Sequence, residues 1–196
     1  MQNIDETKMK PNFFTNLKNK LHQPLSKLQL LIIFFFIYSI IGWCLESIYA
    51  VYELGHFTKR GFLFGPLCPI YGYGAIIVLL ILKPFNKNNI TLFISGAIIL
   101  SIFEYLVGYG LDAMFAMKFW DYTNEFLNIN GRITLWFAIV WGIFGVIFIN
   151  YIHPKLENFI NKHLKKINLS IQHVVLYLFV FLYIADTLIS TIKYML

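Results

Sequence analysis

The sequence predicts an all-α integral membrane protein, a polytopic bundle of five transmembrane helices. Of its 196 residues, 58% are hydrophobic and only 13% are charged, whereas a water-soluble domain carries about 25% charged residues. Five largely uncharged stretches are long enough for the ~20 residues that a helix needs to cross ~30 Å of hydrocarbon. These stretches are continuous apolar runs, unlike the roughly ten-residue alternating segments of a membrane β-barrel.

The first three helices are defined by the charges that bound or interrupt them. Residues 1–27 are polar and rich in Lys, which predicts an amphipathic segment on the membrane surface or a disordered tail. The membrane domain then covers residues 28–196. Its first helix is expected at about 28–52 and contains Glu46, and its second at 61–82, between Arg60 and Lys83. The third, at 90–111, contains Glu104.

The last two helices follow from the same reasoning. A fourth helix is expected at 133–153, between Arg132 and Lys155, and a fifth at 170–192, which contains Asp186. Alternating these five helices across the bilayer places eleven of the sixteen basic residues on the side of the N-terminus and five on the other side. The positive-inside rule therefore predicts a cytoplasmic N-terminus and an external C-terminus.

The net charge of +6 does not indicate a nucleic-acid-binding protein. Most of the Lys residues lie before the first and before the last apolar run, and no basic stripe is interleaved with polar side chains that could read bases. The lipid bilayer is the partner that this distribution predicts, and nucleic acid is not expected.

Three acidic residues interrupt apolar helices: Glu46, Glu104 and Asp186. Each lies ~21–28 Å along its helix at 1.5 Å per residue, in the expected outer half of the membrane. The only two arginines, Arg60 and Arg132, begin the second and fourth helices at the same depth. Acids at this depth need a partner or water, so these residues predict an ion-pair or substrate-binding site. A purely structural pairing, or anchoring to lipid headgroups, remains the alternative.

An external segment, Phe119–Tyr122, predicts an interfacial aromatic cluster, and Asn128–Arg132 predicts a tight turn into the fourth helix. Within it, Asp121 could pair with Arg132 or bind substrate. The two halves of the chain also resemble each other. In each half an acid is followed by an Arg–Gly or Gly–Arg pair and then by an aromatic–Gly pair, Tyr71–Gly72 or Trp141–Gly142, which suggests a parallel two-hairpin repeat.

The expected second helix is interrupted. Proline removes a backbone donor and leaves carbonyl groups free, and such backbone is tolerated in a membrane only inside protein or beside a watery cavity. A kinked helix with glycines at close helix contacts is the alternative. The residues of this broken-helix motif are Gly61, Gly65, Pro66, Pro69, Tyr71, Gly72 and Gly74.

Several segments resemble the type IV ABC transporter permeases, a family of small bacterial membrane proteins. The segments that carry the resemblance are Tyr38–Glu46, Arg60–Pro66, Pro69–Gly72, Phe119–Tyr122, Asn130–Ile133 and His153–Pro154. The resemblance implies a multi-pass protein of the bacterial inner membrane with five or so helices and a role in transport.

Motifs of catalysis and ATP hydrolysis are absent from the sequence. No GxxxxGK[ST] occurs, so an ABC permease of this sequence would need a separate ATPase subunit. No HExxH occurs and the five His are scattered, so we expect neither a metal nor a cofactor. We therefore expect a permease or transport subunit, with a separate ATPase subunit or a homo-oligomer as partner. The alternatives are an intramembrane enzyme that uses paired carboxylates and a scaffold subunit of a membrane complex.

Overall fold

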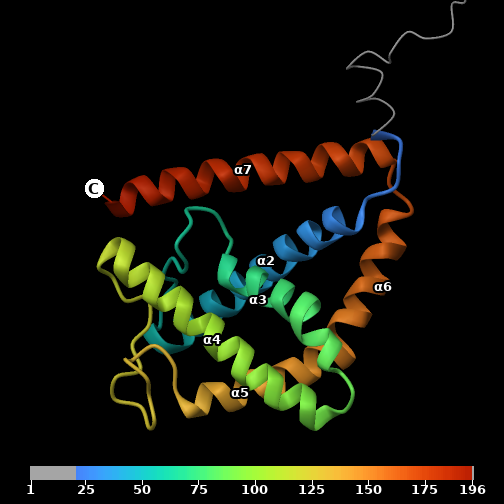
Figure 1. The fold of residues 1–196 in the computed structure, drawn as a ribbon. Coiled ribbons are helices and arrows are strands. Elements are labelled where there is room, and N and C mark those ends of the chain that lie inside the picture. The colour runs from blue at the N-terminus through green and yellow to red at the C-terminus, as the bar shows by residue number, and fades with distance from the viewer. Residues whose placement is uncertain (1–20, 196) are drawn as a thin grey trace, which may run out of the picture.

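A computed structural model describes residues 21–195, and this part of the chain folds as a bundle of α-helices (Figure 1). The prediction for residues 1–27 therefore falls largely on residues outside the described range. The α-helices are α2 (Lys27–Leu54), α3 (Pro69–Ile77), α4 (Asn89–Phe115), α5 (Leu135–Ile147), α6 (His153–Leu164) and α7 (Leu169–Met195).

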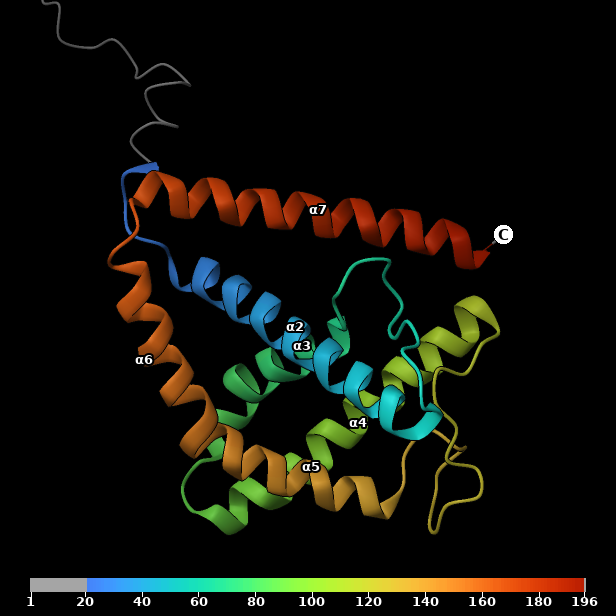
Figure 2. The ribbon, with the colours of Figure 1, turned by 180° about the vertical axis from the view of Figure 1, so that it is seen from behind.

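Four stretches of helix are long and apolar enough to cross a membrane: Lys27–Leu54, Asn89–Phe115, Leu135–Leu164 and Leu169–Met195. A shorter apolar helix covers Pro69–Phe85. The predicted all-α membrane bundle with five apolar helices is confirmed. Helices α2, α4 and α7 run in one direction, and α3 and α5 run back (Figure 1). The same arrangement is seen from behind in Figure 2.

The second helix begins later than the sequence predicts. Residues 61–68 form an irregular segment, and α3 starts at Pro69, which occupies the first helical turn. Proline is tolerated there because the first turn has no intrahelical acceptor for its backbone nitrogen. Pro66, with Pro69 three residues later, prevents the helix from starting at Gly61. The broken-helix motif thus becomes a non-helical entry segment followed by a short helix.

Two π-helical turns continue the short helices. One, η1 (Val78–Leu82), follows α3, and the other, η3 (Phe148–Ile152), follows α5. Each is followed two residues later by a proline, Pro84 or Pro154. A proline ring would clash with a carbonyl group one turn earlier, and a widened turn relieves that clash. After η3 the chain turns into α6, which runs along one end of the bundle to the start of α7 (Figure 1).

The helices form two hairpins, α2 with α3 and α4 with α5. Glycines bring the two helices of each hairpin into close contact. A Cβ built on Gly72 of α3 would lie 2.7 Å from the Phe35 carbonyl oxygen of α2. A Cβ built on Gly142 of α5 would lie 2.8 Å from the Phe93 carbonyl oxygen of α4. Backbones approach this closely only where one residue lacks a side chain. The buried core lies beside these crossings and includes Phe34, Val78, Leu82, Leu92 and Phe148.

Helix α7 is attached to the bundle near its start and near its middle. At its start, the His173 ring is hydrogen-bonded to the Gln29 side chain and to the Gln23 carbonyl oxygen, at 3.0 Å each. Further along, Tyr183 packs edge-on against Phe35 at 5.2 Å between ring centroids. Most of its other apolar side chains are exposed, as expected for a helix that faces lipid.

Candidate functional site

Glu46, in the second half of α2, is bound by a tyrosine of the next helix. The Tyr71 hydroxyl of α3 donates to Glu46 Oε1 at 2.5 Å. Tyr71 is positioned by Gly42, because a Cβ on Gly42 would lie 2.3 Å from the Tyr71 ring. Glu46 is half-buried. Its carboxylate therefore has a neutral donor as a partner.

Glu104, in α4, is more deeply buried and has two donors. The Trp141 indole nitrogen of α5 donates to Glu104 Oε2 at 2.8 Å, and the Tyr122 hydroxyl donates to Glu104 Oε1 at 3.2 Å. Only 5% of Glu104 is exposed. Both carboxylate oxygens thus accept a hydrogen bond, and both donors are neutral aromatic side chains.

Tyr122 binds Glu104 and also feels the charge of Glu46. It lies in the segment between α4 and α5 and stacks on Phe137 at 4.7 Å between ring centroids. Burial raises the pKa of the Tyr122 phenol above its usual range, and the carboxylates of Glu104 and then Glu46 raise it further. The charges of both acids therefore act on the same hydroxyl group. We refer to Glu46, Tyr71, Glu104, Tyr122 and Trp141 as the two-acid site.

The arginines do not pair with the acids of the two-acid site. Arg132 Nη2 binds Asp112 Oδ2 at 2.6 Å, at the end of α4. Arg60 Nη2 lies 3.6 Å from Glu53 Oε2, at the end of α2. Within residues 21–195 no salt bridge joins either arginine to an acid of the two-acid site. The expected pairing is corrected: each arginine binds an acid near the end of its hairpin's first helix.

Asp186 of α7 holds the irregular segment before α3. Its two carboxylate oxygens accept the backbone N–H groups of Phe64 at 2.9 Å and Gly65 at 2.8 Å. The Ser190 hydroxyl donates a third hydrogen bond at 3.0 Å. A Cβ on Gly65 would lie 3.0 Å from Asp186 Oδ2, so glycine gives the carboxylate room to reach the backbone. Asp186 thus satisfies backbone groups that the broken helix leaves free.

Asp121 is part of the loop before α5 and does not bind Arg132. It accepts the Thr123 backbone N–H at 3.0 Å and the Thr123 hydroxyl, and it forms a salt bridge with Lys118 at 3.0 Å. These hydrogen bonds lower the pKa of the Asp121 carboxyl to about 2.

The loop closes with the expected tight turn. Asn130 and Gly131 both have left-handed backbone conformations, with φ of 53° and 67°. The Trp120 indole nitrogen donates to the Arg132 carbonyl oxygen at 3.0 Å. The turn sets where Arg132 and the start of α5 lie.

The two hairpins repeat the same arrangement of contacts. In the first, Glu46 lies eleven residues after Phe35, which faces Gly72. In the second, Glu104 lies eleven residues after Phe93, which faces Gly142.

The aromatic donors occupy matching positions in this repeat. Tyr71 and Trp141 each directly precede the contact glycine, and each lies seven residues before a π-helical turn. Both hairpins run in the same direction (Figure 1). The two-acid site therefore takes one acid and one aromatic donor from each repeat, and Tyr122 adds a second donor to Glu104.

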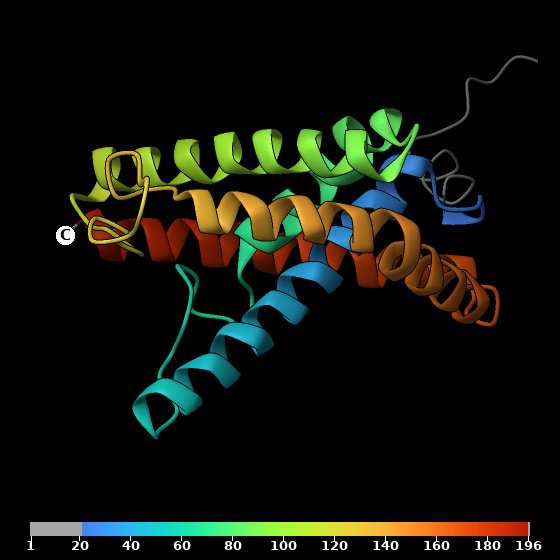
Figure 3. The same ribbon diagram turned by 90° about the horizontal axis from the view of Figure 1, so that it is seen from below.

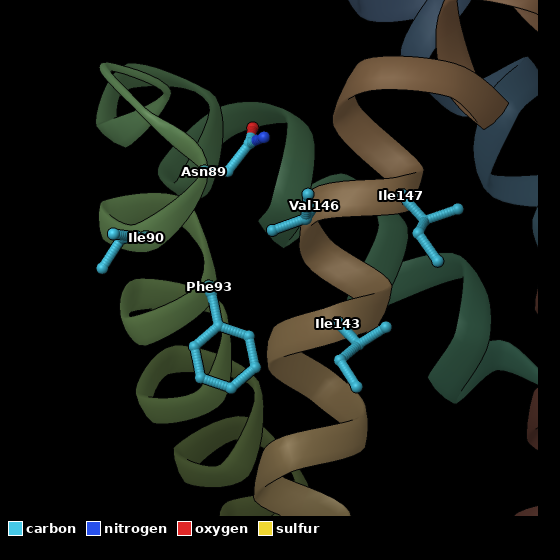
Figure 4. Close-up of a pocket in the computed structure, with 6 residues that line it drawn as sticks. All are labelled: Asn89, Ile90, Phe93, Ile143, Val146 and Ile147. Atoms are coloured by element: carbon cyan, nitrogen blue, oxygen red, sulfur yellow. The ribbon is translucent and has the colours of Figure 1, made fainter.

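Neither Glu46 nor Glu104 lines either of two hollows in the described part of the chain. One of about 320 Å³ lies between the first turns of α4 and the last turns of α5 (Figure 4). Its lining is apolar except for Asn89, whose side-chain oxygen already accepts a hydrogen bond from Asn150. Phe93, which lines it, is about 16 Å along α4 from Glu104. A second, of about 270 Å³, is lined by Ser47, Ile48, Val51 and Phe57.

Sequence reasoning missed the partners of Glu104, Arg60 and Arg132, which are Tyr122, Trp141, Glu53 and Asp112. The sequence holds a signal for two of them. Trp141 occupies the same place in the second half as Tyr71 in the first. Tyr122 belongs to the aromatic segment expected at the membrane interface. Glu53 and Asp112 lie near helix ends, where a charge is unremarkable, and only the fold shows that the arginines reach them.

Comparison with known proteins gives one match. The chain matches the family described as "Putative ABC-transporter type IV" over residues 33–191. This range contains the whole two-acid site, both arginines, Asp121 and Asp186. Neither the curated proteins nor the solved structures include a match to the chain.

Proposed function

Because this chain belongs to the family described as "Putative ABC-transporter type IV", we propose that it is the permease subunit of a membrane transporter and that the two-acid site binds its substrate. One observation carries the proposal. Glu46 and Glu104 lie in helices of membrane-spanning length, and their hydrogen-bond donors are neutral. Acids are costly inside a membrane and usually mark a substrate or ion pathway.

The chemistry of the site favours a cationic substrate. Tyrosine and tryptophan donors satisfy carboxylate oxygens but leave the negative charge uncompensated. A bound cation would compensate it. The aromatic rings of Tyr71, Tyr122 and Trp141 add faces that attract cations. An anionic substrate would meet repulsion from both acids.

A separate ATPase subunit is the proposed partner, because the sequence contains no P-loop. Its proposed docking element is α6, which lies at the end of the bundle opposite the C-terminus (Figure 2). Lys155 and Lys162 lie two turns apart on one exposed side of α6, and the exposed Lys165 and Lys166 follow its end. The positive-inside rule supports a cytoplasmic position for this end. The proposed location is the bacterial inner membrane, and a homo-oligomer is the alternative assembly.

A scaffold subunit is a second candidate, and one observation favours it. Each charged group discussed above has a partner, and neither Glu46 nor Glu104 lines either of the two described hollows. A scaffold would hold these groups permanently in place. It would have no need for a cation to reach Glu46 or Glu104.

A hydrophobic carbodiimide distinguishes the two candidates, because it labels protonated carboxyl groups inside membranes. The full chain in lipid nanodiscs is treated at neutral and mildly acidic pH, and labelled residues are mapped by mass spectrometry. The probe salts are sodium, potassium, magnesium and tetramethylammonium chloride at equal ionic strength. We expect labelling of Glu46 or Glu104 that one of these cations slows. No labelling of either acid, or equal labelling in all four salts, would overturn the cation site.

A further inference from the structure

Phe64, in the irregular segment before α3, lies next to two lysines from distant parts of the chain. Lys59 Nζ is 4.3 Å from the centroid of its ring and Lys193 Nζ of α7 is 4.9 Å from it. Within residues 21–195 no acidic side chain forms a salt bridge with either lysine. Two like charges therefore meet at one ring, and neither is compensated by a salt bridge to an acid of these residues.

The position of this ring is fixed by α7. Asp186 accepts the backbone N–H groups of Phe64 and Gly65, and Lys193 follows seven residues later, two turns along the same face of the helix. The carboxylate that anchors Phe64 is thus bound to backbone groups and Ser190. Lys193, which lies over the Phe64 ring, comes from the same face of α7 as Asp186. Helix α7 therefore holds both the backbone and the ring of Phe64, at which Lys59 also lies.

Next to Lys59, two polar atoms are buried without a hydrogen-bond partner: Thr58 Oγ1 and Arg60 Nε. Arg60 uses one terminal nitrogen to reach Glu53 at 3.6 Å. Buried polar atoms in folded proteins are almost always satisfied. These two donors lie in the same segment as Lys59 and therefore point to an acceptor that binds here.

Aromatic rings surround the neighbouring part of the molecule. Phe62 stacks on Tyr194 at 5.0 Å between centroids, and Phe115 and Phe119 pack against the same pair. Aromatic side chains gather at the level of lipid headgroups. The cluster lies at the ends of α4 and α7, where Figure 3 shows the C-terminus beside the loop before α5. A ligand that accepts hydrogen bonds at this depth lies among lipid headgroups, and the negatively charged group common to phospholipid headgroups is phosphate.

We propose that Lys59 and Lys193, which meet at Phe64, and Arg60, which directly follows Lys59, bind a phosphate group at this end of the bundle. The phosphate belongs to a phospholipid headgroup or to a soluble phosphate. Its oxygens accept charge-assisted hydrogen bonds from the three cations and from Thr58. This site is separate from the two-acid site and does not depend on what the two acids bind.

Native mass spectrometry of the full chain in detergent tests the site, with phosphatidylglycerol titrated as the probe. We expect one tightly held lipid on the natural sequence. In the Lys59→Gln/Lys193→Gln variant the affinity should fall by about tenfold or more, because charge-assisted bonds are removed. A Lys87→Gln/Lys162→Gln variant removes the same charge from exposed positions away from this site and should bind as the natural sequence does. Equal melting temperatures show that the variants are folded.

Inorganic phosphate then distinguishes the two sources. If it displaces the lipid and raises the melting temperature of the natural sequence only, the site takes a soluble phosphate. If the lipid binds and inorganic phosphate does not, the site takes a lipid headgroup. The proposal is overturned if the natural sequence binds neither probe, if the Lys59→Gln/Lys193→Gln variant binds as tightly, or if both double variants lose the same affinity.

Discussion

Trp141 donates its indole N–H to Glu104 at 2.8 Å, in the place where the Tyr71 hydroxyl donates to Glu46 at 2.5 Å in the other hairpin. Each donor precedes a glycine that lets its helix contact the backbone of the acid-bearing helix. The acid, the donor and the close helix contact are therefore repeated together. This repeated arrangement explains why each hairpin places an acid beside an aromatic donor of the neighbouring helix.

The contact glycines are predicted to be intolerant of alanine. A Cβ on Gly72 or Gly142 would press on backbone oxygen atoms, which cannot move aside as a flexible side chain can. We expect Gly72→Ala and Gly142→Ala each to lower the free energy of unfolding by about 1–3 kcal/mol, measured by thermal unfolding in detergent.

Gly110→Ala is the control, because a Cβ there meets no atom within 4 Å. In a helix this exchange should leave the stability unchanged or raise it by up to about 1 kcal/mol. If all three variants unfold at the same temperature, the close contacts at Gly72 and Gly142 are not as described.

Asp186 is predicted to hold the segment before α3 in place. Asp186→Asn keeps one acceptor oxygen and replaces the other by an N–H donor, so it loses one of the two backbone hydrogen bonds. We expect faster hydrogen exchange at Phe64 and Gly65 and a loss of about 1–3 kcal/mol in local stability. Ser190→Ala removes a single hydroxyl donor and should have the smaller effect. Unchanged exchange in Asp186→Asn would show that the carboxylate does not restrain this segment.

The two arginines should differ in their tolerance of lysine. Arg132 binds Asp112 at 2.6 Å, and 16% of its side chain is exposed, whereas Arg60 lies 3.6 Å from Glu53 with 32% exposed. Lysine keeps the charge but lacks the planar fork. We expect Arg132→Lys to cost about 1–3 kcal/mol and Arg60→Lys less than about 1 kcal/mol, measured by thermal unfolding. The reverse order would contradict the pairing.

Much of this fold follows from the sequence, and the later start of α3 shows where that inference fails. Continuous apolar runs predict the membrane helices because few other structures bury so many such residues. Pro66 and Pro69 give a clear signal of interruption, but they do not show that Asp186, more than 100 residues away, would bind the freed backbone. A contact between distant segments depends on the assembled bundle.

The partners of the charges were harder to predict. Positions along the helices predict that Arg60 and Glu46 lie at one depth in the membrane. They do not show that Arg60 pairs instead with Glu53, which lies two turns further along α2. Neutral donors were overlooked because tyrosine and tryptophan at that depth are usually interfacial anchors. The repeat carried the missing information, since the place of Tyr71 predicts that of Trp141.

The loop before α5 should change at acidic pH. Hydrogen bonds from Thr123 and Lys118 lower the pKa of Asp121 to about 2, below the value of about 3.9 for an unfolded chain. The stabilisation of the loop is therefore complete above about pH 4 and is lost as the pH falls through about 2. Limited proteolysis of residues 116–134 across this range measures the change.

Thr123→Val is the comparison for that measurement. It removes the hydroxyl donor and should raise the pKa of Asp121, so the loop should open at a higher pH than in the natural sequence. Lys118→Gln should shift the transition in the same direction. A transition at the same pH in all three proteins would mean that Asp121 does not control it.

The most direct test of the central claim asks whether Glu46 and Glu104 bind the same cation. In lipid nanodiscs, carbodiimide labelling of Glu104 is followed while the protecting cation is titrated, in the natural sequence, in Glu46→Gln and in the control Glu125→Gln. Glu125 is an exposed acid outside the two-acid site. We predict that Glu46→Gln raises the cation concentration needed for protection by about tenfold or more at equal membrane abundance, and that Glu125→Gln has no effect. Unchanged protection in Glu46→Gln would contradict a shared site.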